Sequence, residues 1–144
     1  MANYPLPVFY FKVKYNNQEV GFSDVSGLTQ DIQPIEYRDG LMKGSEPSKK
    51  RPGIRKVNNI SLKRGIVEKN NDLFTWFNNN GNPNVERRDI DVILLNDEGN
   101  PVMIWSIFQA WPIKCEGPGL KATGNDIAIE SLELAHEGIT VKLP

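Results

Sequence analysis

The chain has 144 residues, of which 39% are hydrophobic and 24% are charged, and its formal net charge is −1. This length suits one domain over residues 1–144, and the composition excludes an intrinsically disordered chain. One cysteine excludes an internal disulfide, and no apolar run approaches the ~20 residues that a membrane-spanning helix needs.

The N-terminal half begins with a predicted β-hairpin. Val8–Tyr15 alternates apolar and polar residues, and Glu19–Val25 resumes the alternation after an Asn-Asn turn. Asp31–Arg38 is a third predicted strand. Its Pro34 cannot donate a ladder hydrogen bond and the apolar phase slips there, so we expect an edge position or a β-bulge. Asn58–Arg64 is the fourth strand.

The stretch between the third and fourth strands, Leu41–Lys56, has neither helical nor strand periodicity. Six of its residues are basic and one is acidic, with two prolines and two glycines. A structureless insert this long is uncommon in a compact domain and is usually functional or disordered. We therefore predict a protruding loop over 41–56. Since the rest of the chain is acidic, this loop could bind nucleic acid or the acidic body of another copy.

The one clear helical pattern is Asn71–Gly81. Leu73, Trp76 and Phe77 are spaced i, i+3, i+4, an Asn or Asp can cap the N-terminus, and Gly81 fits the position after the C-terminus. A helix of two or three turns depends on packing rather than on propensity. We expect its aromatic cluster to cover an open end of the core rather than to line a ligand pocket.

The C-terminal half again predicts strands. Asp89–Leu95 and Val102–Phe108 form an apolar hairpin, Gln109–Glu116 extends it past an edge or bend at Pro112, and the last strands are Asp126–His136, with a bulge near Glu130-Ser131, and Ile139–Leu143. The total is seven or eight strands with one short flanking helix and one long basic loop. The expected fold is mainly β, a sandwich or barrel of antiparallel strands.

Catalytic, metal and cofactor sites are not expected. The chain has one histidine, His136, and one cysteine, Cys115, which lacks an activating signature, so neither a dyad nor a closely spaced zinc site is indicated. Gly117-Pro118-Gly119 has no following helix and does not match a phosphate-binding loop. We expect no enzymatic activity.

Two alternatives from other classes stay open. A nucleic-acid-binding barrel would use the basic loop on phosphates, although the loop has no aromatic residue to stack on bases and the acidic remainder would repel the backbone. A ligand-carrying barrel would be a monomer with a small molecule in its core. Rings or tubes in negative-stain microscopy would separate self-assembly from both.

Ordered short motifs run through nearly the whole chain. They are Tyr4–Phe9, Val25–Leu28, Glu36–Gly40, Pro52-Gly53, Asn59–Gly65, Trp76-Phe77, Ala110–Pro112 and Ile127–Gly138. In this order and spacing the chain resembles the inner-tube proteins of contractile tails, the family shared by phage tail tubes and extracellular contractile injection systems. The family-motif positions are Glu36, Tyr37, Arg38, Lys63, Arg64, Trp111 and His136. The opening Tyr4–Phe9 run is closer to injection-system tubes.

The resemblance implies a structural subunit of hexameric rings that stack into a hollow tube, driven into a target by sheath contraction. The implied partners are the protein itself, a sheath protein, baseplate, spike and terminator proteins, and cargo in the lumen, with no cofactor. The alternative within the family is a phage tail tube that conducts DNA. Without a signal peptide, we expect synthesis in the bacterial cytoplasm and function in an assembled virion-like or extracellular particle.

The resemblance also suggests a function for the basic loop. Our hypothesis is that it lies on a neighbouring subunit, where its charges set register and association rate. The loop residues concerned are Met42, Lys43, Lys49, Lys50, Arg51, Ile54, Arg55 and Lys56. The candidate acidic counterparts are Glu116, Asp126, Glu130, Glu133 and Glu137.

Overall fold

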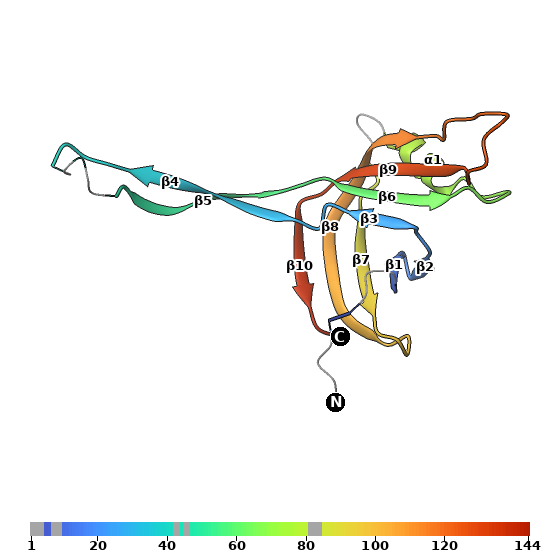
Figure 1. Ribbon diagram of the computed structural model, residues 1–144, viewed down its shortest axis with the longest axis horizontal. Coiled ribbons are helices and arrows are strands. Elements are labelled where there is room, and N and C mark those ends of the chain that lie inside the picture. The colour runs from blue at the N-terminus through green and yellow to red at the C-terminus, as the bar shows by residue number, and fades with distance from the viewer. Residues whose placement is uncertain (1–4, 7–9, 42–43, 45–46, 81–84) are drawn as a thin grey trace.

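The computed structural model describes residues 5–6, 10–41, 44, 47–80 and 85–144. These contain ten strands and one helix (Figure 1): β1 (Phe11–Tyr15), β2 (Gln18–Val20), β3 (Asp24–Ser26), β4 (Gln30–Tyr37), β5 (Lys49–Val57), β6 (Ile60–Gly65), α1 (Asp72–Asn78), β7 (Arg88–Leu95), β8 (Pro101–Glu116), β9 (Ile129–Ala135) and β10 (Gly138–Lys142). The start of the predicted Val8 strand, Gly81, Met42 and Lys43 lie outside the described residues.

The long strand β8 holds the body together because it belongs to two layers. Its first part pairs with β7 and β10, and its second part, from Trp111, pairs with β9, giving the order β2-β1-β7-β8-β9-β6-β3 with antiparallel pairing throughout. The corner lies at Gln109, which has a φ of 54° and donates its backbone N–H to Asp89 Oδ1 at 3.0 Å. Strands that switch sheets at a bend are typical of crossed sandwiches. The predicted mainly-β sandwich is confirmed, and the described strands do not close into a barrel.

The core lies between the two layers. Val13, Ile60, Leu62, Ile90, Ile107, Leu132 and Leu134 have no exposed surface. They come from β1, β6, β7, β8 and β9, so each layer contributes to a single cluster. The predicted hairpin of two apolar strands is confirmed as β7 and β8, which supply much of this core.

Helix α1 covers one end of the core, as predicted. Leu73 and Trp76 are 1% exposed, and Phe77 packs against the cluster. The Asn71 side chain makes no cap hydrogen bond; Asn70 Oδ1 instead accepts one from the Asp72 N–H at 3.2 Å. The helix ends at Asn78, earlier than the pattern predicts.

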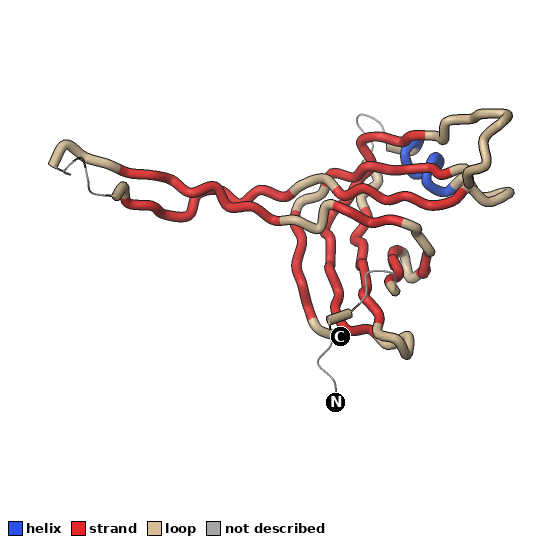
Figure 2. Tube along the Cα trace, in the orientation of Figure 1, coloured by secondary structure: helices blue, strands red, loops and turns tan. Residues whose placement is uncertain are grey.

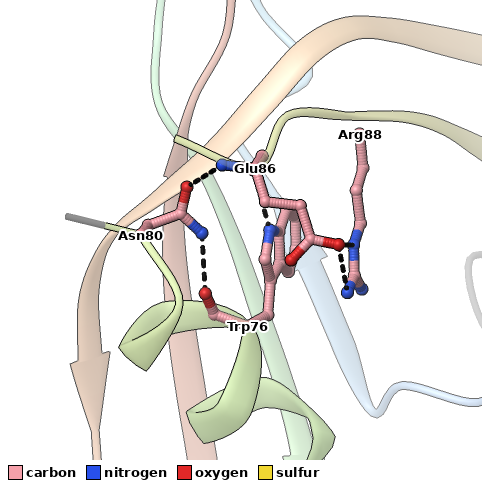
Figure 3. Close-up of polar contacts among 4 residues, drawn as sticks. All are labelled: Trp76, Asn80, Glu86 and Arg88. Atoms are coloured by element: carbon pink, nitrogen blue, oxygen red, sulfur yellow. Dashed lines mark hydrogen bonds and ion pairs between the residues drawn. The ribbon is translucent and has the colours of Figure 1, made fainter. Parts of the chain in front are cut away.

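A small polar network ties the helix to the start of β7 (Figure 3). The Trp76 indole N–H donates to the Glu86 carbonyl at 3.1 Å, and Asn80 Oδ1 accepts the Glu86 backbone N–H. Arg88 lies over the Trp76 ring at 4.4 Å and contacts the Glu86 carboxylate at 3.2 Å. The buried indole is therefore satisfied without any ligand, which supports its structural role.

A nearly buried ion pair joins β6 to β9. Arg64 Nε donates to Glu130 Oε1 at 2.7 Å, and the two side chains are 8% and 14% exposed. Arg64 also donates to Asn70 Oδ1 at 3.3 Å. Burying a charge this far from water is costly in free energy unless an opposite charge is paired with it.

Two predicted strand boundaries and one predicted bulge are wrong. Glu19–Val25 is not one strand, because the chain breaks at Gly21 and pairs first with β1 and then with β6. The strand Asp126–His136 begins only at Ile129, and the β6–β9 register is regular where a bulge was expected at Glu130-Ser131. The alternation of apolar residues suggested a bulge for two reasons. Glu130 is charged although it faces inward, and Ile127 lies before the strand begins. The register shift lies on β8 instead, between Pro112 and Lys114, within a strand that continues past Pro112.

The predicted structureless loop over 41–56 is also partly wrong. Lys49–Val57 is strand β5, and it pairs with β4 in a hairpin that leaves the body (Figure 2). We call Gln30–Val57 the arm. Strand periodicity in sequence reflects one buried face, and a ribbon with both faces exposed has no such signal.

The ion pair gives a stability prediction. Glu130→Ala should lower the free energy of unfolding by about 3 kcal/mol, because it leaves the Arg64 guanidinium buried without its anion. Chemical denaturation followed by circular dichroism measures this. The matched control is Glu133→Ala on the same strand, which removes an acceptor of the exposed Asn59 amide and should cost less than about 0.5 kcal/mol. Equal losses would contradict the assignment.

A second prediction concerns the root of the arm. Gly27 has a φ of 92°, and a Cβ there would meet the Asn59 carbonyl oxygen at 2.1 Å. Gly99 has a φ of 82° with open space around it. Gly27→Ala should therefore destabilise the protein clearly more than Gly99→Ala, which carries only the backbone strain of about 1–2 kcal/mol. Thermal unfolding of both variants measures the difference; similar losses would show that Asn59 moves away freely.

Candidate interaction surface

The arm is the most exposed structure in the described chain. Every residue of β4 is exposed, and seven of the nine residues of β5 are exposed. The hairpin extends away from the body along the long axis of the molecule (Figures 1 and 2). An isolated two-stranded hairpin is marginally stable in water. A ribbon of this kind is therefore not part of the core, and its surface is open to contact with a partner.

Apolar side chains on the arm lie open to solvent. Ile54 is 81% exposed, and Ile32, Ile35, Tyr37 and Leu41 are also exposed. The sequence pattern suggested that the isoleucines of β4 belong to an ordinary body strand. Their exposure was missed because an apolar residue on an exposed strand has the same sequence pattern as one in a core.

The arm has a bulge where Pro34 predicted one. The register shifts between Ile32 and Pro34, and Pro34 lies opposite Pro52. Gly53 fills the irregularity, since a Cβ there would come within 2.4 Å of the Gln33 carbonyl oxygen. A residue other than glycine would push the strands apart just before Ile54.

Basic residues line β5. Lys49, Lys50, Arg51, Arg55 and Lys56 are all exposed, and Lys50 lies 3.6 Å from Glu36 across the hairpin. The side chains of that pair are each more than half exposed, so the ion pair contributes little to stability. The strand therefore presents a positive surface beside the apolar side chains.

The arm is attached to the body at a constrained root. His136 Nε2 lies 2.8 Å from the carbonyl oxygen of Asn58, the residue after β5, and Nδ1 lies 3.2 Å from the Gly138 carbonyl oxygen. A neutral imidazole has one N–H, so it donates to one of these carbonyls at a time. The imidazole therefore joins the arm to the start of β10.

The candidate acidic residues differ in their availability. Glu130 is engaged by Arg64 and is nearly buried, so it has little surface for a neighbour. Glu137 lies 3.4 Å from Arg87, and Glu116 lies 3.9 Å from Lys114, both with exposed side chains. Glu133 accepts a hydrogen bond from Asn59 at 3.3 Å. Asp126 lies in the exposed loop between β8 and β9. The five carboxylates do not form one cluster on a single face.

The family-motif positions serve different parts of the structure. Glu36 and Tyr37 lie on the arm, where the Tyr37 hydroxyl donates to Asp39 Oδ2 at 3.4 Å, and Arg38 follows at the end of β4. Arg64 and His136 have the internal contacts described above. Lys63 lies opposite Asp24 and Ser131 in the sheet, and Trp111 has Arg87 over its ring at 6.0 Å.

Chemistry of the catalytic or metal-binding kind finds little support in the described residues. Burial raises the pKa of the Cys115 thiol, and the nearby Glu130 carboxylate acts in the same direction, so the reactive thiolate is disfavoured. No group of three or more metal-ligating side chains occurs within the described ranges. Nor does any described helix combine the length and hydropathy of a transmembrane segment.

Comparisons with solved structures identify close relatives of the fold. A chain of the extracellular contractile injection system PVC sheath-tube complex in its extended state is 34% identical, with 99% of this chain and 94% of that chain covered and a TM-score of 0.90. A chain of the anti-feeding prophage cap, described as the tube-terminating cap, is 31% identical, covers 100% and 95%, and has a TM-score of 0.91.

A more distant structure shares the fold alone. Hcp1 from Flavobacterium johnsoniae is 16% identical, with 94% of this chain and 97% of that chain covered and a TM-score of 0.64. Among curated proteins no significant match is found. The family model of the T4-like virus tail tube protein gp19 matches residues 7–140. With nearly the whole chain matched, and with structural relatives above 30% identity, the chain belongs to the gp19 tail tube protein family.

Proposed function

We propose that the protein is the structural subunit of the hollow inner tube of a contractile injection system. Hexameric rings of the chain stack into a tube, cargo passes through its lumen, and sheath contraction drives the tube into a target. The observation that carries this proposal is an arm exposed at every residue of β4 in a chain that belongs to a tube protein family. The 34% identity to a chain of an extracellular injection-system complex favours this class over a phage tail.

The second candidate is the tail tube of a contractile-tailed phage, which would conduct DNA. The family model, named for a T4-like virus, favours it. The two candidates use the same subunit geometry and differ in cargo. Purified particles that contain DNA would support the phage tail, and particles that contain protein would support the injection system.

The partners follow from the same reasoning. Neighbouring structures are described as a sheath-tube complex, a sheath/tube terminator, a tube-terminating cap and a baseplate. We infer that this chain contacts other copies of itself, a sheath protein, a terminator and a baseplate with its spike. We also infer synthesis in the bacterial cytoplasm and function in an extracellular particle. A tube subunit needs no catalytic group, and we propose that the protein is not an enzyme.

The arm is the part of the chain that we assign to inter-subunit contact. Nine residues of β5 at ~3.3 Å each span roughly 30 Å, whereas a body of this size has a radius of gyration of roughly 15 Å. The arm can therefore cross onto another subunit. There it would bury the exposed Ile32, Ile54 and Tyr37 and place its positive charges against an acidic body. Contacts of this kind would fix the register of the assembly.

Removing the arm gives a direct prediction. Replacing residues 31–56 by a short Asn-Gly turn should leave a folded body, because Gln30 and Val57 already lie opposite each other and the arm packs mainly on itself. The variant should unfold at nearly the same temperature as the parent protein and remain monomeric.

Analytical ultracentrifugation and negative-stain microscopy provide the measurement. The control is a smaller deletion at the β7–β8 turn, where Asn96–Asn100 is shortened to Asn-Gly, and this variant should still assemble. Tubes of normal length from the armless variant would rule out the proposed role of the arm.

A further inference from the structure

The end of the molecule opposite the arm carries a second exposed apolar surface. Leu120 is 86% exposed and Ile127 is 78% exposed, both in the loop between β8 and β9. They line a groove of about 410 Å³ together with Lys121, Gly124 and Asp126. We call this surface the loop groove. Singly exposed apolar residues are ordinary, but two that share a groove indicate a binding surface.

The loop groove has a defined shape. The Gly124 N–H donates to the Lys121 carbonyl at 3.0 Å, which closes a turn in the loop. The Ile66 N–H donates to the Ala128 carbonyl at 2.9 Å, so the return of the loop is tied to the end of β6. Ile66 and Val67 are themselves exposed and extend the apolar surface beside the loop. Backbone contacts within the loop and at its return to β9 therefore hold the groove.

The positions of the two exposed surfaces suit a repeating contact. In Figure 1 the arm extends to one side of the body, and the loop before β9 lies at the opposite side, beside α1. One chain therefore carries its two exposed apolar surfaces at the two ends of its long axis. A contact that joins unlike ends of identical subunits repeats from copy to copy, as rings and filaments require.

We propose that the loop groove of one copy receives the arm of another. Ile54, the most exposed isoleucine of the arm, lies between Leu120 and Ile127 of the neighbour. The basic residues Arg51 and Arg55 then approach the Asp126 carboxylate. This inference rests on the proposed tube function and adds the surface on the neighbour that recognises the arm.

Apolar and charged side chains favour the arm of a second copy as the occupant of the groove. The arm contributes an apolar side chain flanked by cations. The groove contributes two apolar side chains, one carboxylate, Asp126, and one amine, Lys121, so its Asp126 carboxylate is the group that can pair with an arm cation. Of the candidate acidic residues, Asp126 is the one that lines this groove. Glu130, although close in sequence, is held by Arg64 inside the body. Asp126 is therefore the candidate carboxylate that we assign as the counterpart of the arm.

Disulfide cross-linking tests the contact. In a Cys115→Ser background, Ile54→Cys is combined with Leu120→Cys, the protein is assembled, tubes are checked by microscopy, and the sample is then oxidised. A disulfide forms only when the two Cβ atoms approach within about 4.5 Å. We expect a ladder of covalently linked chains on a non-reducing gel, extending beyond the dimer because each chain has one arm and one groove.

The control pairs Ile54→Cys with Val141→Cys, a half-exposed position on β10 away from the loop groove, and should give no ladder. Tubes without a ladder, or an equal ladder in the control, would overturn the docking site while leaving the tube function intact. A parent protein that forms no rings or tubes before oxidation would contradict the tube function and the docking site together.

Discussion

The assembly that we propose depends on an arm that its own body does not cover. Backbone groups of a two-stranded ribbon are satisfied only along the shared edge, and this ribbon leaves apolar side chains in water on both of its strands. Such a hairpin gains little from the body that carries it. In the proposed tube, a neighbouring copy would supply the contacts that stabilise it.

The body provides what an assembling subunit needs, which is a rigid base for the arm. Strand β8 turns the corner at Gln109 and pairs with strands of both layers, so one continuous strand links the two sheets. The Arg64–Glu130 pair fixes β6 to β9. At the root, Gly27 packs against Asn59 and His136 lies between Asn58 and Gly138. These contacts set the direction in which the arm leaves the body.

Sequence patterns identified the body well because its strands have one buried face. The hairpin of apolar strands, the helix that covers the core and the bulge at Pro34 all follow from local rules, and the structure confirms them. The sequence patterns were less accurate where the alternation of apolar and polar residues does not follow burial. Strand β5 has no buried face, and a carboxylate fills an inward position of β9. The basic charge of the arm was visible in the sequence, whereas its pairing with β4 and the groove at Leu120 required three-dimensional structure.

The central claim is that the arm becomes ordered by a neighbouring copy. Hydrogen–deuterium exchange of the β4 and β5 amides tests it most directly, compared between dilute monomer and assembled protein. The account predicts rapid exchange in the monomer and strong protection in the assembly, while the core strands β7 and β8 change little. Equal exchange of the arm amides in the two states would contradict the account.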